Sequence, residues 1–133
     1  MAHILATAAL IASGQATFYA PGVMDTVIDN RVSWGQLPPQ VRAAEAVALL
    51  DPDWIGKNVW VELPGGEVYG PLIVADCAAA HDRERLQRIG WAVDINYTLA
   101  MRLGIIDGPM WGVRVWDQYP HETRNDWPRG EAE

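Results

Sequence analysis

Two aspartates of this chain stand in strand-like apolar runs, and each is a candidate for acid–base chemistry. Asp76 ends the run PLIVA and Asp94 lies inside the run WAVDI, with a charged segment between the two runs. Aspartate is a poor strand residue and is rarely buried without a partner. An apolar setting raises the pKa of a carboxyl, which can then hold a proton and donate it during a reaction.

Structural roles for these residues stay open beside the chemical ones. Asp94 precedes an expected helix, and its carboxylate could accept hydrogen bonds from backbone amides there. Asp76 could in the same way hold the loop that follows its strand. Cys77 and His81 could form a nucleophilic pair. Cys77 follows an apolar strand rather than opening a helix, however, so we favour packing for this thiol.

Composition excludes several classes of protein. The 133 residues, half of them apolar, predict one globular domain with a real core. A formal net charge of -7 without a basic patch argues against a nucleic-acid partner. The one cysteine cannot form a disulfide within the chain. His3, His81 and His121 lack metal-ligand spacing, so we expect no metal and no cofactor.

Short strands dominate the expected secondary structure. A turn at PGG joins two of them into a hairpin, and Gly90 and Gly104 end two helical segments. Many short strands with few helices predict a small closed β-barrel, which removes exposed sheet edges. The expected strands are 15–20, 57–63, 67–76, 91–95 and 110–116; the expected helices are 37–50, 81–90 and 96–104; and 23–35 is expected as a strand or loop.

The two ends of the chain are expected to lie outside the barrel. The apolar run 4–12 is followed by small residues, as in a secretion signal, but no Lys or Arg precedes it. It is too short to span a bilayer, so we expect no membrane span. Residues 1–13 are therefore an uncleaved leader or a first strand, 14–116 the barrel and 117–133 a polar tail. An extracytoplasmic or secreted location follows from the leader-like run.

The order of several motifs resembles a known family. A strand ending in VAD, a variable loop, VDIN leading into a helix that ends in LG, and a strand GVRVW follow one another. Upstream stand ATFY and the strand GKNVWVEL with its turn Gly65-Gly66. This series resembles the double-psi β-barrel of the RlpA-like, barwin-like and expansin-like domains over residues 14–116. The resemblance implies a mainly β fold, a small six-stranded double-psi β-barrel with short helical inserts.

The resemblance also implies a function and site residues. Such domains act on or bind cell-wall polysaccharide, peptidoglycan above all, and some are lytic transglycosylases. It implies that Asp76 is the general acid and base, that Asp94 is its partner, and that both face one groove. Thr17, Tyr19 and Trp91 are then groove contacts. A carboxyl that protonates the leaving oxygen is common in sugar cleavage.

One departure from the family keeps a second role open. Leu50 stands about where the lytic members carry a histidine, so a glycan-binding or wall-loosening role without cleavage is also predicted. Tryptophans in or beside the strands could stack on the apolar faces of sugar rings, namely Trp54, Trp60, Trp91 and Trp111. For Trp60, within an alternating strand, we favour core packing.

A hypothesis of another class is a structural subunit. A chain with an apolar start and no cleaved leader could self-assemble into a virion or an extracellular filament. The barrel would then be scaffold, since fold alone does not give function.

Overall fold

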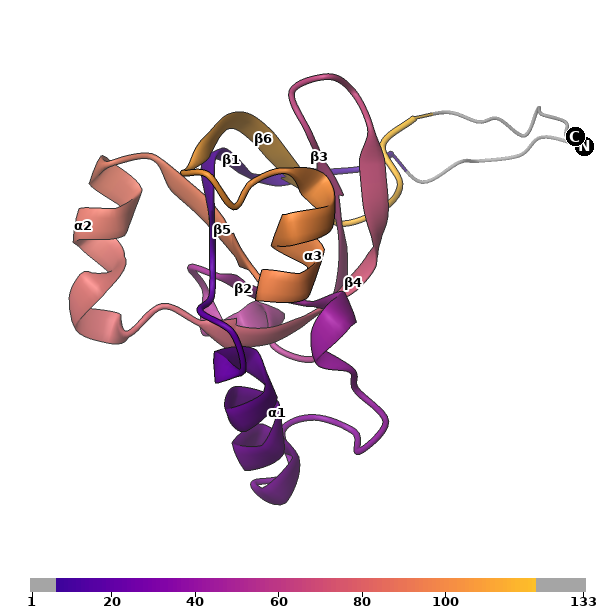
Figure 1. Ribbon diagram of the computed structural model, residues 1–133, viewed down its shortest axis with the longest axis vertical. Helices are drawn as coiled ribbons and strands as arrows, with labels where there is room; N and C mark the ends of the chain where they lie inside the picture. Colours follow the sequence, from indigo (N-terminus) through magenta and orange to yellow (C-terminus); the bar gives the residue numbers. More distant parts are fainter. Residues whose placement is uncertain (1–6, 122–133) are drawn as a thin grey trace, which may run out of the picture.

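Six strands close into a barrel in the computed structural model, which describes residues 7–121. Closure pairs both edges of the sheet, as expected for a small β protein. The predicted small six-stranded, mainly β barrel with short helical inserts is confirmed. Around the barrel the order is β1-β5-β2-β4-β3-β6, with β1 (Leu10–Phe18), β2 (Ala46–Leu49), β3 (Asn58–Glu62), β4 (Val68–Cys77), β5 (Trp91–Ile95) and β6 (Met110–Trp116) (Figure 1).

The pairing of the strands is mixed. β1 with β5 and β2 with β4 are parallel, whereas the other four pairs are antiparallel. Only β3 and β4 are joined as a hairpin, and the predicted turn between them is confirmed by the 2.8 Å bond from Leu63 N to Glu67 O. Parallel pairs need crossover connections, and the helices over 23–33 and 83–88 lie in the connection from β1 to β5.

Valines fill the barrel. β-branched side chains pack well on a pleated sheet, and alternation sends every second one inward. The core also takes in Ile95 and Leu99, the latter from a helix. The fully buried valines are Val47, Val59, Val61, Val74, Val93, Val113 and Val115.

The expected strand or loop over 23–35 is wrong, because this segment is helix α1 (Val23–Ser33). α1 packs below the barrel through Met24 and Ile28, which are four residues apart on one helical face (Figure 1). These two side chains meet Ala46 and Ala75 of the barrel wall. Helical periodicity did not reveal this helix, because its buried stripe holds only Met24 and Ile28. Val23 and other apolar residues lie outside the stripe and obscure the pattern.

The expected helix over 37–50 is also wrong. The segment forms a 3-10 turn η1 (Ala43–Glu45) followed by β2, whose four residues are all buried. β2 lies between β4 and β5 and packs on both faces, so its run AVAL is continuously apolar. Periodicity cannot distinguish a short run of this kind from a buried helix. Here the pairing with two neighbouring strands makes the run a strand.

Two predicted helices are confirmed, α2 (Arg83–Arg88) and α3 (Tyr97–Leu103). Asn96 precedes α3 as expected, but its buried side chain makes no capping hydrogen bond. Short 3-10 turns, η2 (Pro52–Trp54) and η3 (Ala80–Asp82), complete the helical inserts. Within residues 7–121, none of the helices has the length and apolar character that crossing a membrane requires.

The ends of the described chain meet. Of the segment 1–13, expected as a leader or a first strand, residues Leu10 to Ser13 belong to β1, and residues 1–6 lie outside the described part. Ala9 N donates to Asp117 Oδ1 at 2.7 Å, and Asp117 N donates to Ala9 O at 3.1 Å. Most of the predicted polar tail, 122–133, is outside the described part as well.

Candidate functional site

A row of residues crosses four adjacent strands of the barrel. Thr17 on β1 pairs with Asp94 on β5, Asp94 pairs with Ala48 on β2, and Ala48 pairs with Asp76 on β4. Directly opposed residues on neighbouring strands have side chains about 5 Å apart at their Cβ atoms. The fold thus brings the two predicted acids onto one line, two strands apart.

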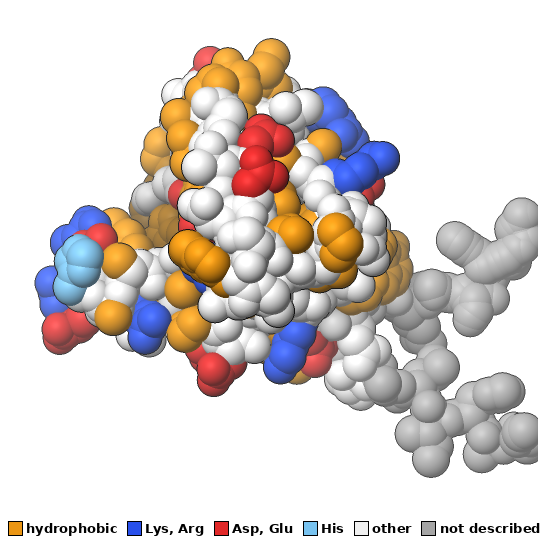
Figure 2. Space-filling model, turned by 90° about the horizontal axis from the view of Figure 1, so that it is seen from below, with side chains coloured by type: hydrophobic (Ala, Val, Ile, Leu, Met, Phe, Trp, Pro, Cys, Tyr) orange, Lys and Arg blue, Asp and Glu red, His pale blue; other side chains and the backbone are white. Residues whose placement is uncertain are grey.

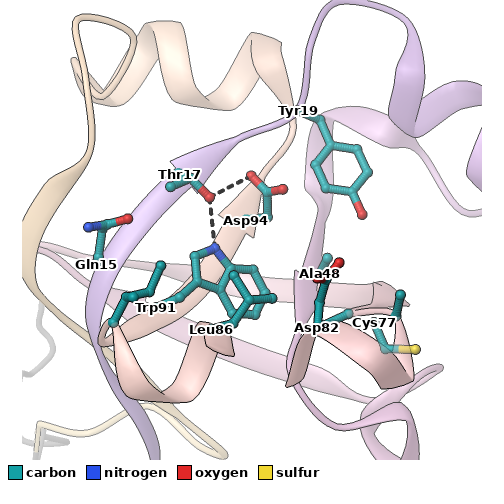
Figure 3. A pocket seen from close by; sticks show the side chains of 12 residues that line it. Gln15, Thr17, Tyr19, Ala48, Cys77, Asp82, Leu86, Trp91 and Asp94 are labelled. Atoms are coloured by element: carbon teal, nitrogen blue, oxygen red, sulfur yellow. Dashed lines mark hydrogen bonds between the residues drawn. The ribbon is translucent and has the colours of Figure 1, made fainter. Parts of the chain in front are cut away.

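Asp94 opens on a hollow of about 390 Å³ on the outside of the barrel. Its neighbours Val93 and Ile95 belong to the core, so the alternation of the strand turns Asp94 outward. Of the predicted site residues, Thr17, Tyr19, Trp91 and Asp94 line this space, which we call the Asp94 hollow (Figure 3). The lining residues that sequence reasoning had not assigned to the groove are Gln15, Ala48, Cys77, Ala78, Ala79, Asp82, Leu86 and Ile89.

A chain of two hydrogen bonds orients the acid. Trp91 Nε1 donates to Thr17 Oγ1 at 2.8 Å, and Thr17 Oγ1 donates to Asp94 Oδ1 at 3.0 Å (Figure 3). An indole nitrogen can only donate, so the threonine hydroxyl must accept from Trp91 and is free to direct its own proton to Asp94. The parallel register of β1 and β5 makes this chain possible.

Burial controls the acidity of Asp94. Removal of the carboxylate from water raises its pKa from the ordinary 3.8 to about 6. Hydrogen bonds from Thr17 and from the backbone of Ile95 lower this pKa, and the negative charge of Asp76 raises it, but burial is the largest of these effects. In mildly acidic solution Asp94 therefore holds a proton in a space that solvent can enter.

Asp76 has a different environment. Its Oδ2 accepts a hydrogen bond from Tyr19 Oη at 2.5 Å, and its Oδ1 accepts one from Arg31 Nη2 at 2.6 Å. The side chains of Arg31 and Asp76 are only 16% and 17% exposed, so the ion pair is largely shielded from water. Asp76 does not line the Asp94 hollow, although its partner Tyr19 does. Burial, and then Asp76, raise the pKa of the Tyr19 phenol, which stays protonated and donates.

Sequence reasoning missed Arg31 because it placed this residue in a strand or loop. Arg31 lies in the last turn of α1, and its second guanidinium nitrogen Nη1 donates to Gln36 Oε1 at 2.6 Å. The guanidinium thus ties α1 to the row of acids. An unpaired acid at the end of an apolar strand was the available signal that a basic partner was needed.

Two other residues considered from the sequence, His81 and Leu50, do not line the Asp94 hollow. Cys77 lines the Asp94 hollow. The side chain of His81 is 84% exposed, and its Nε2 lies 3.6 Å from Asp82 Oδ2. The imidazole of His81 therefore pairs with a carboxylate and not with the thiol of Cys77. Leu50 lines a second hollow, also of about 390 Å³, on the other side of Trp91. None of the twelve residues lining the Asp94 hollow is a histidine. Residues 7–121 contain no group of three or more His, Cys, Asp or Glu that could hold a metal ion.

Positive charge is mostly neutralised locally in the described part of the chain. On the face seen in Figure 2, Lys and Arg side chains lie in separate small groups among acidic and uncharged surface. Exposed pairs of this kind contribute little stability. The arginines paired with acidic side chains are Arg31, Arg42, Arg85, Arg88 and Arg114.

Comparisons with protein-family models, with curated proteins and with solved structures gave no significant match to this chain. The chemistry of the site is therefore derived from its own residues. The central features are an acid whose pKa is raised by burial, its support by Thr17 and Trp91, and the open hollow in front of it.

Proposed function

We propose that this protein acts on cell-wall polysaccharide, peptidoglycan in particular, with Asp94 as the general acid and base. The observation that carries the proposal is the carboxyl of Asp94, which has a pKa of about 6 and faces an open hollow. A carboxyl whose pKa is raised toward neutrality can deliver a proton to a glycosidic oxygen. The motif series VAD, VDIN and GVRVW supports the same class of substrate.

Asp94 suits the role of proton donor better than Asp76. Both oxygens of Asp76 accept hydrogen bonds, one from the phenol of Tyr19 and one from the guanidinium of Arg31, so neither oxygen faces the Asp94 hollow as a free group. Within residues 7–121, Asp94 has one side-chain hydrogen-bond partner, Thr17, and it lines the open hollow. Asp76 acts through Asp94 instead, because its negative charge helps to raise the pKa of the neighbouring acid.

The reaction that one acid can serve is an intramolecular transglycosylation. The Asp94 proton moves to the glycosidic oxygen as the bond between that oxygen and the anomeric carbon breaks. A hydroxyl oxygen of the same sugar then bonds to the anomeric carbon, and its proton returns to the Asp94 carboxylate. The cycle leaves the enzyme unchanged, consumes no water and gives an anhydro-sugar end.

The walls of the Asp94 hollow suit a sugar ring. Trp91, Leu86 and Ile89 offer apolar surface to the C–H face of a ring, while Gln15 and Thr17 offer polar atoms to its hydroxyls. This mixture of apolar walls and few polar groups is usual in sites for small uncharged ligands. No histidine lines the Asp94 hollow, whereas the lytic members of the family that the sequence resembles carry one. This difference favours a second candidate function, in which the glycan is bound or loosened without cleavage.

Digestion of purified peptidoglycan sacculi, read by mass spectrometry, tests the proposal. The wild type is expected to release anhydro-sugar ends. Asp94→Asn keeps the shape of the side chain but cannot donate the proton, so the rate should fall at least about 100-fold. Asp76→Asn should retain most of the rate, and Asp107→Asn, on the exposed surface, is the matched control.

The outcomes separate the alternatives. Loss of products with Asp76→Asn and not with Asp94→Asn would assign the acid to Asp76 and contradict our assignment. No products, with binding of the wild type to sacculi intact, would leave a glycan-binding module. Neither products nor binding would overturn the glycan function and favour a structural subunit, which sedimentation of the purified protein as a large oligomer would support.

A further inference from the structure

Trp111 is an exposed tryptophan beside the Asp94 hollow that the proposed reaction does not use. Its side chain is 56% exposed on β6. The ring lies close to Gly90, since a Cβ atom on that glycine would be 3.1 Å from Cζ3 of the indole. Gly90 stands between Ile89 and Trp91, and both of these line the Asp94 hollow. Trp111 is thus an apolar surface at the border of the proposed site.

The strand that carries Trp111 is the neighbour of the strands that line the Asp94 hollow. The lining residues Cys77, Ala48, Asp94 and Thr17 belong to β4, β2, β5 and β1, which are consecutive strands. The next strand in the closed barrel is β6, which pairs with β1. Trp111 therefore extends the line of the hollow by one strand.

A β-bulge presents this side chain. Gly14 pairs with Val113 and Ala16 pairs with Met110, so Trp111 and Gly112 together oppose the single residue Gln15. Bulges turn side chains away from regular alternation and are common beside active sites. Gln15 lines the Asp94 hollow, and the bulge thus sets Trp111 beside the polar end of that space.

Backbone supports the indole. Gly14 approaches the 89–90 turn so closely that a Cβ there would be 2.1 Å from Gly90 O, and Gln15 N donates to the same carbonyl at 2.8 Å. Gly90 has a φ of 80° and no side chain, which leaves room for the ring. A platform held by backbone loses little conformational freedom when a ligand covers it.

We propose that Trp111 is a second sugar-binding position for the glycan held at Asp94, so that the ligand is an extended polymer rather than a single sugar unit. This inference rests on the proposed function. From β4 to β6 the line crosses four of the six interstrand spacings of the closed barrel, so it follows the curved outer wall. Ile89, 46% exposed, lines the Asp94 hollow and precedes Gly90, the residue against which the Trp111 ring lies. A chain lying across the strands would cover all three side chains.

Calorimetric titration with peptide-free peptidoglycan fragments tests the platform, with every protein carrying Asp94→Asn so that the glycan is not cut during the titration. With an octasaccharide, Trp111→Ala should bind about 5- to 10-fold more weakly than the protein with Trp111 intact, and with a disaccharide the two should agree within about twofold. Trp34→Ala is the matched control, because Trp34 is 64% exposed and lies at the end of α1. Trp111→Tyr keeps an aromatic ring and should retain most of the affinity for the octasaccharide.

Failure of this inference differs from failure of the proposed function. Equal octasaccharide affinity of the wild type and Trp111→Ala would overturn the second position while leaving glycan binding intact. Equal weakening by Trp111→Ala and Trp34→Ala would overturn it as well. A wild type that binds neither fragment nor sacculi would overturn both proposals together. Circular dichroism of each variant verifies the fold, and the exposure of both tryptophans makes folding defects unexpected.

Discussion

Asp76 and Asp94 pair with the same residue, Ala48, from the two sides of β2. The two acids thus lie on either side of one residue, yet their surroundings differ. Arg31 neutralises the first, whereas burial without a cation destabilises the charge of the second. Two carboxyls with separate environments can take separate roles, one as a fixed charge and the other as a proton carrier.

The raised pKa of Asp94 predicts a stability cost at neutral pH. In the folded state this carboxyl binds its proton up to about pH 6, whereas in the unfolded chain it releases the proton near the ordinary 3.8. The native state is therefore fully favoured below about pH 4 and loses stability as pH rises through 6. Asp94→Asn should unfold with a free energy about 3 kcal/mol higher than the wild type at about pH 8, and with little difference at about pH 4.

Urea unfolding across that pH range measures the effect. Asp107→Asn, at an exposed position, should differ from the wild type by less than about 0.5 kcal/mol throughout. An Asp94→Asn curve parallel to that of the wild type at all pH values would contradict the buried, proton-holding state of Asp94.

The hydroxyl of Thr17 links Trp91 to the acid, and its removal should alter the acid. Thr17→Val has a similar shape but cannot hydrogen-bond, so the pKa of Asp94 should rise above about 6, because the bond from Thr17 lowers it. The Trp91 N–H also loses its acceptor, at a cost of about 1–2 kcal/mol in the free energy of unfolding. Carbon-13 titration of the Asp94 carboxyl by NMR measures the pKa. Thr17→Ser retains the hydroxyl and should match the wild type, and equal titration of all three proteins would refute the link.

The ion pair of Arg31 with Asp76 should matter more than an exposed one. Arg31→Leu leaves a largely buried carboxylate without its cation and should lower the free energy of unfolding by about 2 kcal/mol. Arg42→Leu breaks an exposed pair with Glu45, whose side chains are 71% and 57% exposed, and should cost less than about 1 kcal/mol. Thermal and urea unfolding of both variants compare the two pairs. An equal loss in both would mean that the Arg31 pair does not anchor α1.

The sequence was sufficient to predict β3, β4, β5 and β6: β3 from its period-two alternation, and the other three from short apolar runs. The turn between β3 and β4 followed from the run PGG, and closure into a barrel followed from the number of short strands. The family resemblance grouped Thr17, Tyr19, Trp91 and Asp94 with Asp76. The fold brings the first four to one hollow and leaves Asp76 outside its lining, and the roles of all five stay a prediction.

Tertiary structure alone decided α1, β2 and the difference between the two acids. β2 is a strand because two neighbours pair with it, and α1 is a helix because one narrow stripe meets the barrel wall. Arg31 lies 45 residues from Asp76, and Thr17 lies 77 residues from Asp94. A carboxyl's acidity depends on water exclusion and on charges within a few ångströms. By itself the sequence determined the barrel and the residues able to do chemistry; which acid holds the proton was decided by neighbours that only folding brings together.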